Sequence, residues 1–256
     1  MHDLRRTEAP RQLLTDIDAA TDWLRRFLLH CKPLVLTGAG ISIASGLPAY
    51  RDDAGRWQHA QPMQHRDFVT DDAARRRYWS RAMLGWQAFS SASPSAVHTV
   101  LAAWQAAAKV GLIATQNVDT LHQRAGSTKV VDLHGRLDQV VCLDCGDTST
   151  RADMQARLRK ANPDIQVDSN TLVKPDGDVG FELDDAHFDV PVCSQCSGRL
   201  KPDVVFYGDT VPAERVASVR RALDDSGALL VIGSSLSVYS GYRIARWAAE
   251  AQYPIT

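Results

Sequence analysis

The chain has 256 residues, and its 30 acidic side chains nearly balance its 29 basic ones. Such a balance offers no electrostatic attraction to nucleic acid, so we expect no nucleic-acid partner. No apolar run is long enough to span a bilayer, and the first residues lack the apolar core of a secretory signal. We therefore expect a cytoplasmic protein without membrane contact, built as one large α/β domain or as a large domain with a small inserted one.

Apolar spacing predicts alternating helices and strands along most of the chain. The first helix is expected over residues 16–29, where apolar residues recur at helical spacing before Lys32 and Pro33. The apolar run 34–36 then leads into a glycine turn and a helix, the pattern of a buried parallel strand. Further strands are expected at 112–115, 130–133, 204–206 and 229–233, and further helices at 71–89, 96–109, 213–224 and 242–251. This order predicts a Rossmann-like parallel sheet with helices on both faces.

Polar turns follow three of the predicted strands, at 38–42, 115–117 and 233–235. Ligands of parallel sheets bind beyond the carboxyl ends of the strands, so we expect these turns to converge on one crevice. Gly38 and Gly40 would let the backbone approach a phosphate at the start of the next helix, although a tight turn without a ligand also explains them. Ile43 stands where the dehydrogenase fingerprint needs its third glycine, which disfavours hydride transfer.

Four of the five cysteines form two C-x-x-C pairs. The pairs are Cys142 with Cys145 and Cys193 with Cys196. Two such pairs can close a tetrahedral thiolate shell around one Zn²⁺ ion, and a closed shell is structural because it leaves no position for substrate. Gly146 and Gly198 follow the pairs closely, as tight metal-binding turns require. Two disulfides or two coincidental pairs are the alternatives, and Cys31 is expected to be a core thiol.

Several ordered motifs resemble those of the sirtuin family. They are Gly38-Ala39-Gly40-Ile41-Ser42, residues 45–51, residues 115–119, Leu133-His134-Gly135, both cysteine pairs, residues 201–209 and residues 233–236. The resemblance covers about residues 14–256. Segments at 77–86, 175–178 and 238–243 are similar to the group that includes mitochondrial sirtuin-4, and the chain resembles a bacterial-style member of that group.

The resemblance implies an enzyme that cleaves NAD at the nicotinamide–ribose bond and passes the acyl group of a modified lysine to ADP-ribose. The products would be nicotinamide and O-acyl-ADP-ribose, the partners acyl-lysine proteins or peptides, and the default acyl group acetyl. Two other classes stay open. They are protein mono-ADP-ribosyl transfer at the same NAD site and a zinc-organised binding module with little catalysis.

The resemblance also implies which residues carry this reaction. His134 matches the family's general base, a task that suits a near-neutral pKa, and Asn117 matches a catalytic residue beside the ribose. The implied NAD contacts are Gly38, Ala39, Gly40, Ser42, Ala49, Tyr50, Arg51, Gln116, Asn117, Asp119, Gly233, Ser234 and Ser235. Structural alternatives remain: a backbone-bonded imidazole, an Asx turn capping the next helix, and a plain turn at 233–235.

Two segments are implied in substrate binding. They are the peptide-pairing backbone of Val204, Val205, Phe206, Tyr207 and Gly208, and the pair Tyr78 and Arg81. Main-chain pairing would add the peptide as a strand. The Y-x-x-R spacing is used for acidic acyl groups in the desuccinylase branch of the family, and on a helix it places both side chains on one face, as it does in any ordinary surface pair.

Two departures from the family pattern lower the expected activity. Ala49 and Tyr50 stand where many members have aspartate and phenylalanine, so we expect a different nicotinamide wall and slower turnover. The sequence stops at Thr256, before the family's last strand and adenine-binding residues. An unpaired sheet edge and a thinner adenine pocket would weaken NAD binding or stability.

The motifs divide the chain into two predicted domains. Residues 14–136 and 201–256 would form the NAD-binding domain, with a helical insertion at about 56–95. Residues 137–200 would form the small zinc-binding domain. We expect the zinc ion to set the mutual position of the base and the substrate cleft from a distance.

Overall fold

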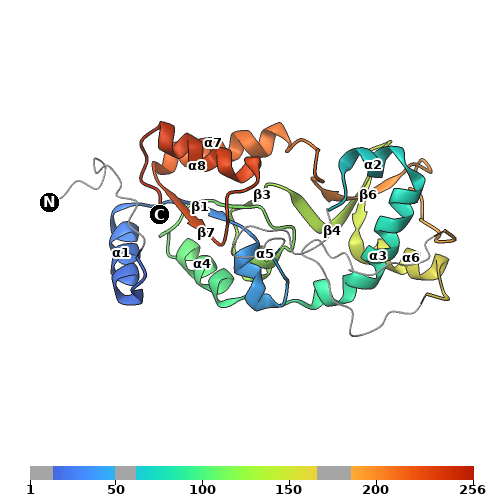
Figure 1. The fold of residues 1–256 in the computed structure, drawn as a ribbon, viewed down its shortest axis with the longest axis horizontal. Helices are drawn as coiled ribbons and strands as arrows, with labels where there is room; N and C mark the ends of the chain where they lie inside the picture. Colours follow the sequence, from blue (N-terminus) through green and yellow to red (C-terminus); the bar gives the residue numbers. More distant parts are fainter. Residues whose placement is uncertain (1–13, 50–61, 166–185) are drawn as a thin grey trace.

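The protein contains a four-stranded parallel sheet with helices on both sides (Figure 1). The computed structural model describes residues 14–49, 62–165 and 186–256. The strands, in the order β3–β2–β1–β7, are β1 (Leu34–Thr37), β2 (Ile113–Thr115), β3 (Val130–Asp132) and β7 (Leu229–Ile232). The surrounding helices are α1 (Ile17–His30), a 3-10 helix η1 (Ala39–Ser45), α4 (Ala96–Ala106), α5 (Leu121–Arg124), α7 (Ala213–Ser226) and α8 (Tyr239–Glu250). The α/β fold class is confirmed.

Strand β1 shows why the sheet must be covered on both faces. Successive strand side chains point to opposite faces, and Leu34, Val35 and Leu36 are all fully buried. Leu34 and Leu36 pack with residues of α7 and α8, whereas Val35 packs with residues of α1 and α4. Each such side chain contributes about 1.5–3 kcal/mol when it is fully buried. Among the described residues, no helix is long and apolar enough to cross a bilayer.

A second, antiparallel sheet has the strand order β5–β4–β6. Its strands are β4 (Gly135–Cys142), β5 (Thr148–Thr150) and β6 (Leu200–Val204), and the helices beside it are α2 (His65–Thr70), α3 (Asp72–Ser91) and α6 (Arg151–Ala161). Phe68 and Trp79 from the predicted helical insertion share one core with Val140, Met154 and Leu158 of the cysteine-bearing segment. The insertion and this segment therefore stabilise each other. The predicted domain boundaries stay a prediction.

The strand predicted at residues 204–206 is wrong in its extent and in its partner. The strand ends at Val204 and pairs antiparallel with β4, not with the parallel sheet. The apolar residues that follow the strand are explained by aromatic packing. The centroid of the Phe206 ring lies 5.1 Å from that of Phe68 and 5.2 Å from that of Tyr78. A short apolar run alone cannot distinguish such packing from a buried strand.

The last residues pair with the edge strand β7. The Leu229 amide donates to Pro254, the Val231 amide donates to the Thr256 carbonyl, and the Thr256 amide donates to Leu229, at distances of 2.8–3.0 Å. The expected unpaired edge is therefore not found along this part of β7.

We predict that Gly135→Ala destabilises the protein far more than the matched change Gly46→Ala. The φ angles are nearly equal, +81° at Gly135 and +83° at Gly46, so both variants carry left-handed backbone strain of about 1 kcal/mol. A Cβ atom at Gly135 would also collide with the Asp203 carbonyl on β6, whereas nothing lies within 4 Å of one at Gly46. The loss of unfolding free energy should exceed about 3 kcal/mol only for Gly135→Ala. Urea unfolding measures both, and equal losses would contradict the clash.

Candidate active site and zinc site

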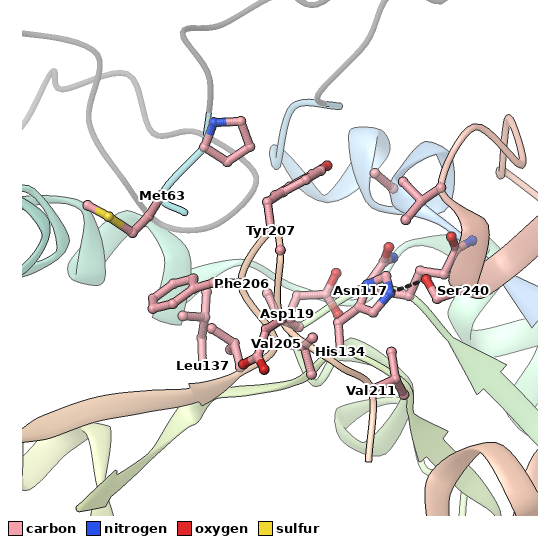
Figure 2. A pocket seen from close by; sticks show the side chains of 18 of the residues that line it. Met63, Asn117, Asp119, His134, Leu137, Val205, Phe206, Tyr207, Val211 and Ser240 are labelled. Atoms are coloured by element: carbon pink, nitrogen blue, oxygen red, sulfur yellow. Dashed lines mark hydrogen bonds between the residues drawn. The ribbon is translucent and has the colours of Figure 1, made fainter. Parts of the chain in front are cut away.

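A pocket of about 370 Å³ lies where the two sheets meet. This volume falls in the range of small-molecule sites, about 300–1,000 Å³. The loops after β1, β2 and β3, the segment after β6 and the start of α8 line it. Its polar residues include Ser42, Gln116, Asn117, Asp119, His134, Ser240 and Arg243, and its apolar residues include Leu47, Met63, Tyr78, Leu137, Val204 and Phe206. Figure 2 shows Asn117, His134 and Ser240 gathered on one side, away from Phe206, Leu137 and Met63.

The three polar turns meet as the sequence predicts. The Asn117 side chain donates to the Gly38 carbonyl over 3.1 Å, and the Gly40 amide donates to the Gly233 carbonyl over 2.9 Å. Gln116 Nε2 donates to Ser234 Oγ over 2.7 Å. The carboxyl ends of β1, β2 and β7 are thus tied directly to one another.

The glycines of the first turn have a structural reason that needs no ligand. A Cβ atom at Gly38 would lie 2.8 Å from the Gly233 carbonyl oxygen, and one at Gly40 would lie 2.9 Å from Gly233 Cα. Real Cβ atoms do not approach backbone so closely, because the atoms would overlap. Ala39 and Ser42 line the pocket, whereas the two glycines and residues 233–235 are not among its lining residues. A role for these turns in NAD binding stays a prediction.

His134 is held as a neutral base that faces the pocket. Its Nδ1 lies 2.8 Å from the Gln116 carbonyl oxygen, which can only accept, so Nδ1 carries the proton. Nε2 then accepts a hydrogen bond from Ser240 Oγ at 2.6 Å (Figure 2). Burial lowers the pKa of His134 against the opposing effect of the Gln116 hydrogen bond, and the positive charges of Arg243 and Arg215 lower it further.

Asp119 and Asn117 form one buried network with Ser42. Ser42 Oγ donates to Asp119 Oδ2 over 2.7 Å, and Asn117 Nδ2 lies 3.1 Å from Ser42 Oγ. The other carboxylate oxygen of Asp119 accepts the Leu121 amide at the start of α5, over 2.9 Å. The capping alternative therefore holds for Asp119. Capping leaves both side chains in the pocket lining, so the alternative does not exclude a ligand role.

The predicted substrate residues are only partly brought together. Residues 204–208 and Tyr78 all line the pocket, but Arg81, which is half-buried one turn after Tyr78, does not line its described part. Within the segment, the Val205 amide already donates to the His134 carbonyl, and the Tyr207 carbonyl accepts the His65 amide, both over 2.8 Å. Ala49 is half-buried outside the pocket lining, and Tyr50, Arg51 and the motif at 175–178 lie outside the described residues.

Sequence reasoning gave no site role to Ser240 and Arg243, two pocket residues on α8, although both lie in the family-like segment 238–243. The predicted helix began at Tyr242, whereas α8 begins at Tyr239. Its N-cap position, Val238, makes no side-chain capping hydrogen bond, so the usual start signal is missing. With the correct start, Ser240 and Arg243 are three residues apart on one helix and share a face.

The four paired cysteines form one cluster. All four sulfur atoms lie within 4.8 Å of one another, with Cys142 Sγ 3.6 Å from Cys196 Sγ and Cys145 Sγ 3.8 Å from Cys193 Sγ. A tetrahedron with Zn–S bonds of about 2.3 Å has edges of about 3.8 Å, so the cluster fits one structural Zn²⁺ ion. The spacings are too long for disulfide bonds, which rules out that alternative. Cys31 is half-buried beside the core that covers β1.

The two metal-binding turns differ in how they use glycine. Gly146 has the left-handed φ of +75°, and its amide donates to the Cys142 carbonyl. In the second turn Ser197, not Gly198, has positive φ, at +61°. Gly198 is needed for space, because a Cβ atom there would lie 2.6 Å from an oxygen of Asp144 and 2.9 Å from Cys142 Sγ. The prediction for Gly146 is confirmed, and the conformational reason given for Gly198 is wrong.

Two further histidines form a buried pair. His98 and His122 have ring centroids 4.8 Å apart, and both are essentially inaccessible to solvent. His122 Nε2 lies 2.9 Å from Thr37 Oγ1, and His98 Nδ1 lies 2.8 Å from Ser95 Oγ. Burial, reinforced by His98, lowers the pKa of His122 to about 3, and burial lowers the pKa of His98 as well. Both histidines are therefore neutral in the folded protein at neutral pH.

Comparison with known proteins identifies the chain. The Sir2 family model matches residues 38–240, a range that contains all four clustered cysteines and most of the pocket lining. The chain belongs to the Sir2 family. This confirms the family resemblance on which the site residues were proposed.

Sir2-family relatives are similar over most of the chain. NAD-dependent protein deacetylase 2 of Bradyrhizobium diazoefficiens is 46% identical over 228 residues, covering 88% of this chain and 83% of the relative. The NAD-dependent protein deacetylase of Bordetella bronchiseptica is 48% identical over 234 residues, covering 91% and 85%. Human mitochondrial NAD-dependent protein lipoamidase sirtuin-4 is 45% identical over 237 residues, covering 91% and 75%.

Solved Sir2 structures share the fold. One, reported as the structural basis for the mechanism and regulation of Sir2 enzymes, has a TM-score of 0.71 and 26% identity, covering 93% of this chain and 85% of that chain. A Sir2 variant solved with a deacetylated p53 peptide and 3′-O-acetyl-ADP-ribose has a TM-score of 0.70 and 25% identity, covering 92% and 85%. The similarity therefore extends across both sheets.

We predict that Cys142→Ala loses the zinc ion and much of the stability, because a three-thiolate site binds metal weakly and zinc binding is coupled to folding. Elemental analysis should give one zinc per chain for the wild type and clearly less for Cys142→Ala, with a lower Tm. The control is Cys31→Ala, which changes the cysteine outside the cluster and should keep the metal. A metal-free Cys142→Ala protein with the wild-type Tm would overturn the structural assignment.

We predict that the buried histidine pair makes stability fall in mild acid. The folded pKa of His122 is about 3 and its unfolded pKa about 6.5, so between these values only the unfolded chain binds the proton. The free energy of unfolding then falls with falling pH, by about 1.4 kcal/mol per pH unit for His122. Urea unfolding between pH 5 and 6 measures how the free energy of unfolding depends on pH. His122→Gln should reduce this dependence by about 1.4 kcal/mol per pH unit, which corresponds to about one proton. An unchanged slope would show that His122 is protonated in the folded protein.

Proposed function

We propose that this Sir2-family protein is an NAD-dependent protein lysine deacylase. It transfers the acyl group of a modified lysine to ADP-ribose and releases nicotinamide. The observation that carries the proposal is the neutral His134, whose Nε2 faces the pocket between its polar and apolar parts. Relatives at 45–48% identity are named deacetylases and a lipoamidase, which supports the same reaction class for this chain.

The polar half of the pocket suits NAD. Asp119 is fixed by Ser42 and the Leu121 amide, so its carboxylate and the amide of Asn117 offer preset acceptor and donor groups. These residues hold the nucleotide together with Ala39, Ser42, Gln116 and the turns at 38–40 and 233–235, and Ala49, Tyr50 and Arg51 complete the proposed set. NAD supplies a nicotinamide–ribose bond whose cleavage leaves an electrophilic carbon for the acyl oxygen.

His134 acts as the general base. Its Nε2 takes a proton from a ribose hydroxyl, and the hydrogen bond from Nδ1 to the Gln116 carbonyl stabilises the imidazolium that results. The lowered pKa keeps the base unprotonated at neutral pH. Ser240 holds the ring in position through Nε2 until the substrate hydroxyl replaces it.

The apolar half of the pocket receives the acyl chain. Tyr78, Leu137 and Phe206 provide an apolar wall next to His134, and residues 204–208 lie beside it for peptide binding. The Val205 amide and Tyr207 carbonyl are engaged within the protein, so peptide pairing uses other backbone groups of the segment. Tyr78 is placed to contact the acyl chain, and Arg81 joins it only if the side chain moves.

Zinc supports this arrangement indirectly. Strands β4 and β6 pair through Gly135 and Val204 at the pocket and, beyond an irregular stretch, from Val140 with Pro202 to Cys142 with Leu200 at the metal cluster. The ion therefore fixes the far end of the two strands that carry the base and the substrate segment. Thiolate ligands require a reducing environment, which supports a cytoplasmic location.

We predict that the wild type removes acyl groups from lysine peptides only with NAD, and that His134→Ala lowers kcat/KM by about 100-fold or more because the base is lost. The reaction and the preferred acyl group are measured by mass spectrometry of a peptide panel. The lysine of each peptide carries an acetyl group, a lipoyl group or an acyl group that ends in a carboxylate. His30→Ala, at an exposed position on α1, is the control and should retain activity.

Two outcomes would contradict the proposed function. Transfer of labelled ADP-ribose from NAD to protein, without loss of an acyl group and still present in His134→Ala, would indicate mono-ADP-ribosyl transfer. No nicotinamide release with any peptide in the panel would favour a binding module.

A further inference from the structure

Arg243 is a cation of the pocket that the proposed reaction does not use. It lies on α8 three residues after Ser240, so the same helix face that holds His134 also presents a guanidinium group to the pocket. Arg243 and His134 line the same pocket, and the positive charge of Arg243 helps to lower the pKa of His134. Figure 2 shows Ser240 on the side of His134 away from Phe206, so this end of the pocket is separate from the apolar wall.

The guanidinium of Arg243 is only partly satisfied. Its Nη2 atom is buried and has no hydrogen-bond partner among the described residues. The group lies over the Trp247 ring, with 5.7 Å from its central carbon to the ring centroid, so one face of the guanidinium is packed. Burying a charged donor without a partner is costly, which favours a site that an anionic ligand completes.

The acids around the pocket already have other partners. Asp119 accepts from Ser42 and the Leu121 amide, and Asp209 accepts the Thr210 amide and lies 3.0 Å from His65 Nδ1. Asp203 lies 3.7 Å from Arg215, and Glu250, on α8 itself, lies 3.3 Å from Arg246. No described carboxylate neutralises Arg243 by a salt bridge. Within the part of the chain that the structure describes, Arg243 therefore has no counter-charge, and a bound anion can provide one.

The position of Arg243 selects the kind of anion. The pocket passes between the segment 204–211 and the start of α8, and Val211, Val238 and Tyr239 line it together with Arg243. In the proposed complex, a peptide bound beside residues 204–208 extends toward Val211 and the start of α8, while its acyl chain enters the apolar half of the pocket with Phe206 and Leu137. Arg243 lies on α8 at this end of the pocket, so in that complex it is nearer to the residues that flank the modified lysine than to the end of the acyl chain.

We propose that Arg243 is a specificity residue that binds the carboxylate of an aspartate or glutamate flanking the acyl-lysine in the substrate. This inference rests on the proposed deacylase function. A guanidinium binds a carboxylate through paired N–H donors, and the partly buried position strengthens the pair relative to one at the surface. The protein then prefers acyl-lysines in acidic sequence contexts.

Peptide pairs test the proposal. The two peptides of a pair carry the same acyl-lysine and differ only at one flanking position, which is glutamate in one peptide and glutamine in the other. Separate pairs place this difference at each of the two positions before and the two positions after the acyl-lysine. The wild type should favour glutamate at one of these positions by about 10-fold or more in kcat/KM, and Arg243→Gln should abolish the preference while Arg243→Lys retains part of it. The control is Arg246→Gln, which removes an exposed arginine on the same helix and should keep the wild-type ratio.

Three results would overturn the proposal. They are a glutamate preference that persists in Arg243→Gln, a preference that follows an acidic acyl chain instead of the flanking residue, and a raised KM for NAD with an unchanged peptide ratio. Fluorescence anisotropy with labelled glutamate and glutamine peptides gives the same comparison without turnover. If the wild type binds the glutamate peptide more tightly but releases no nicotinamide, the proposed reaction fails while the assignment of Arg243 stands.

Discussion

The pairing of β4 with β6 is the constraint on which the site depends. At one end Gly135 lies so close to β6 that no side chain fits between them, and His134 immediately precedes this contact. At the other end the two strands lead into the two halves of the cysteine cluster. The same pair of strands, paired at both ends with an irregular stretch between Gly135 and Val140, therefore sets the spacing between the base and the segment beside the substrate. Without zinc, the ends of β4 and β6 at the cysteine cluster would be less restrained and this spacing would vary, although none of the cysteines lines the pocket.

The pocket combines two environments that the chemistry needs side by side. Aromatic packing among Phe68, Tyr78 and Phe206 builds a rigid apolar wall from the second sheet and its helices. The hydrogen-bonded turns at the end of the parallel sheet supply fixed polar groups. Neither part alone would place an acyl chain next to a sugar hydroxyl. Their junction at His134 explains why the reacting centre lies between two sheets.

Much of the fold and site could be predicted from sequence because local patterns determine them. The run at 34–36 followed by a glycine turn predicts β1, and the C-x-x-C spacing predicts the metal cluster. The segment 238–243 resembles the family, but the pocket roles of Ser240 and Arg243 could not be predicted from it, because an uncapped helix start carries no local signal that places them on one helix face. The misplaced strand at 204–206 has a related cause, since Phe206 owes its burial to aromatic partners far away in the sequence. The sequence motifs therefore predict where the site lies, whereas tertiary contacts determine which other residues line its pocket.

The hydrogen bond between Ser240 and His134 has an energetic consequence for substrate entry. The lone pair of Nε2 is already satisfied by a hydroxyl group before any sugar arrives. An incoming ribose hydroxyl exchanges one O–H···N bond for another of the same chemical type, so the net change in hydrogen-bond energy is small. The released serine hydroxyl can in turn rotate toward a new acceptor, because its proton position is not fixed. The site thus keeps its base continuously partnered, and the binding energy of the substrate is not consumed in desolvating it.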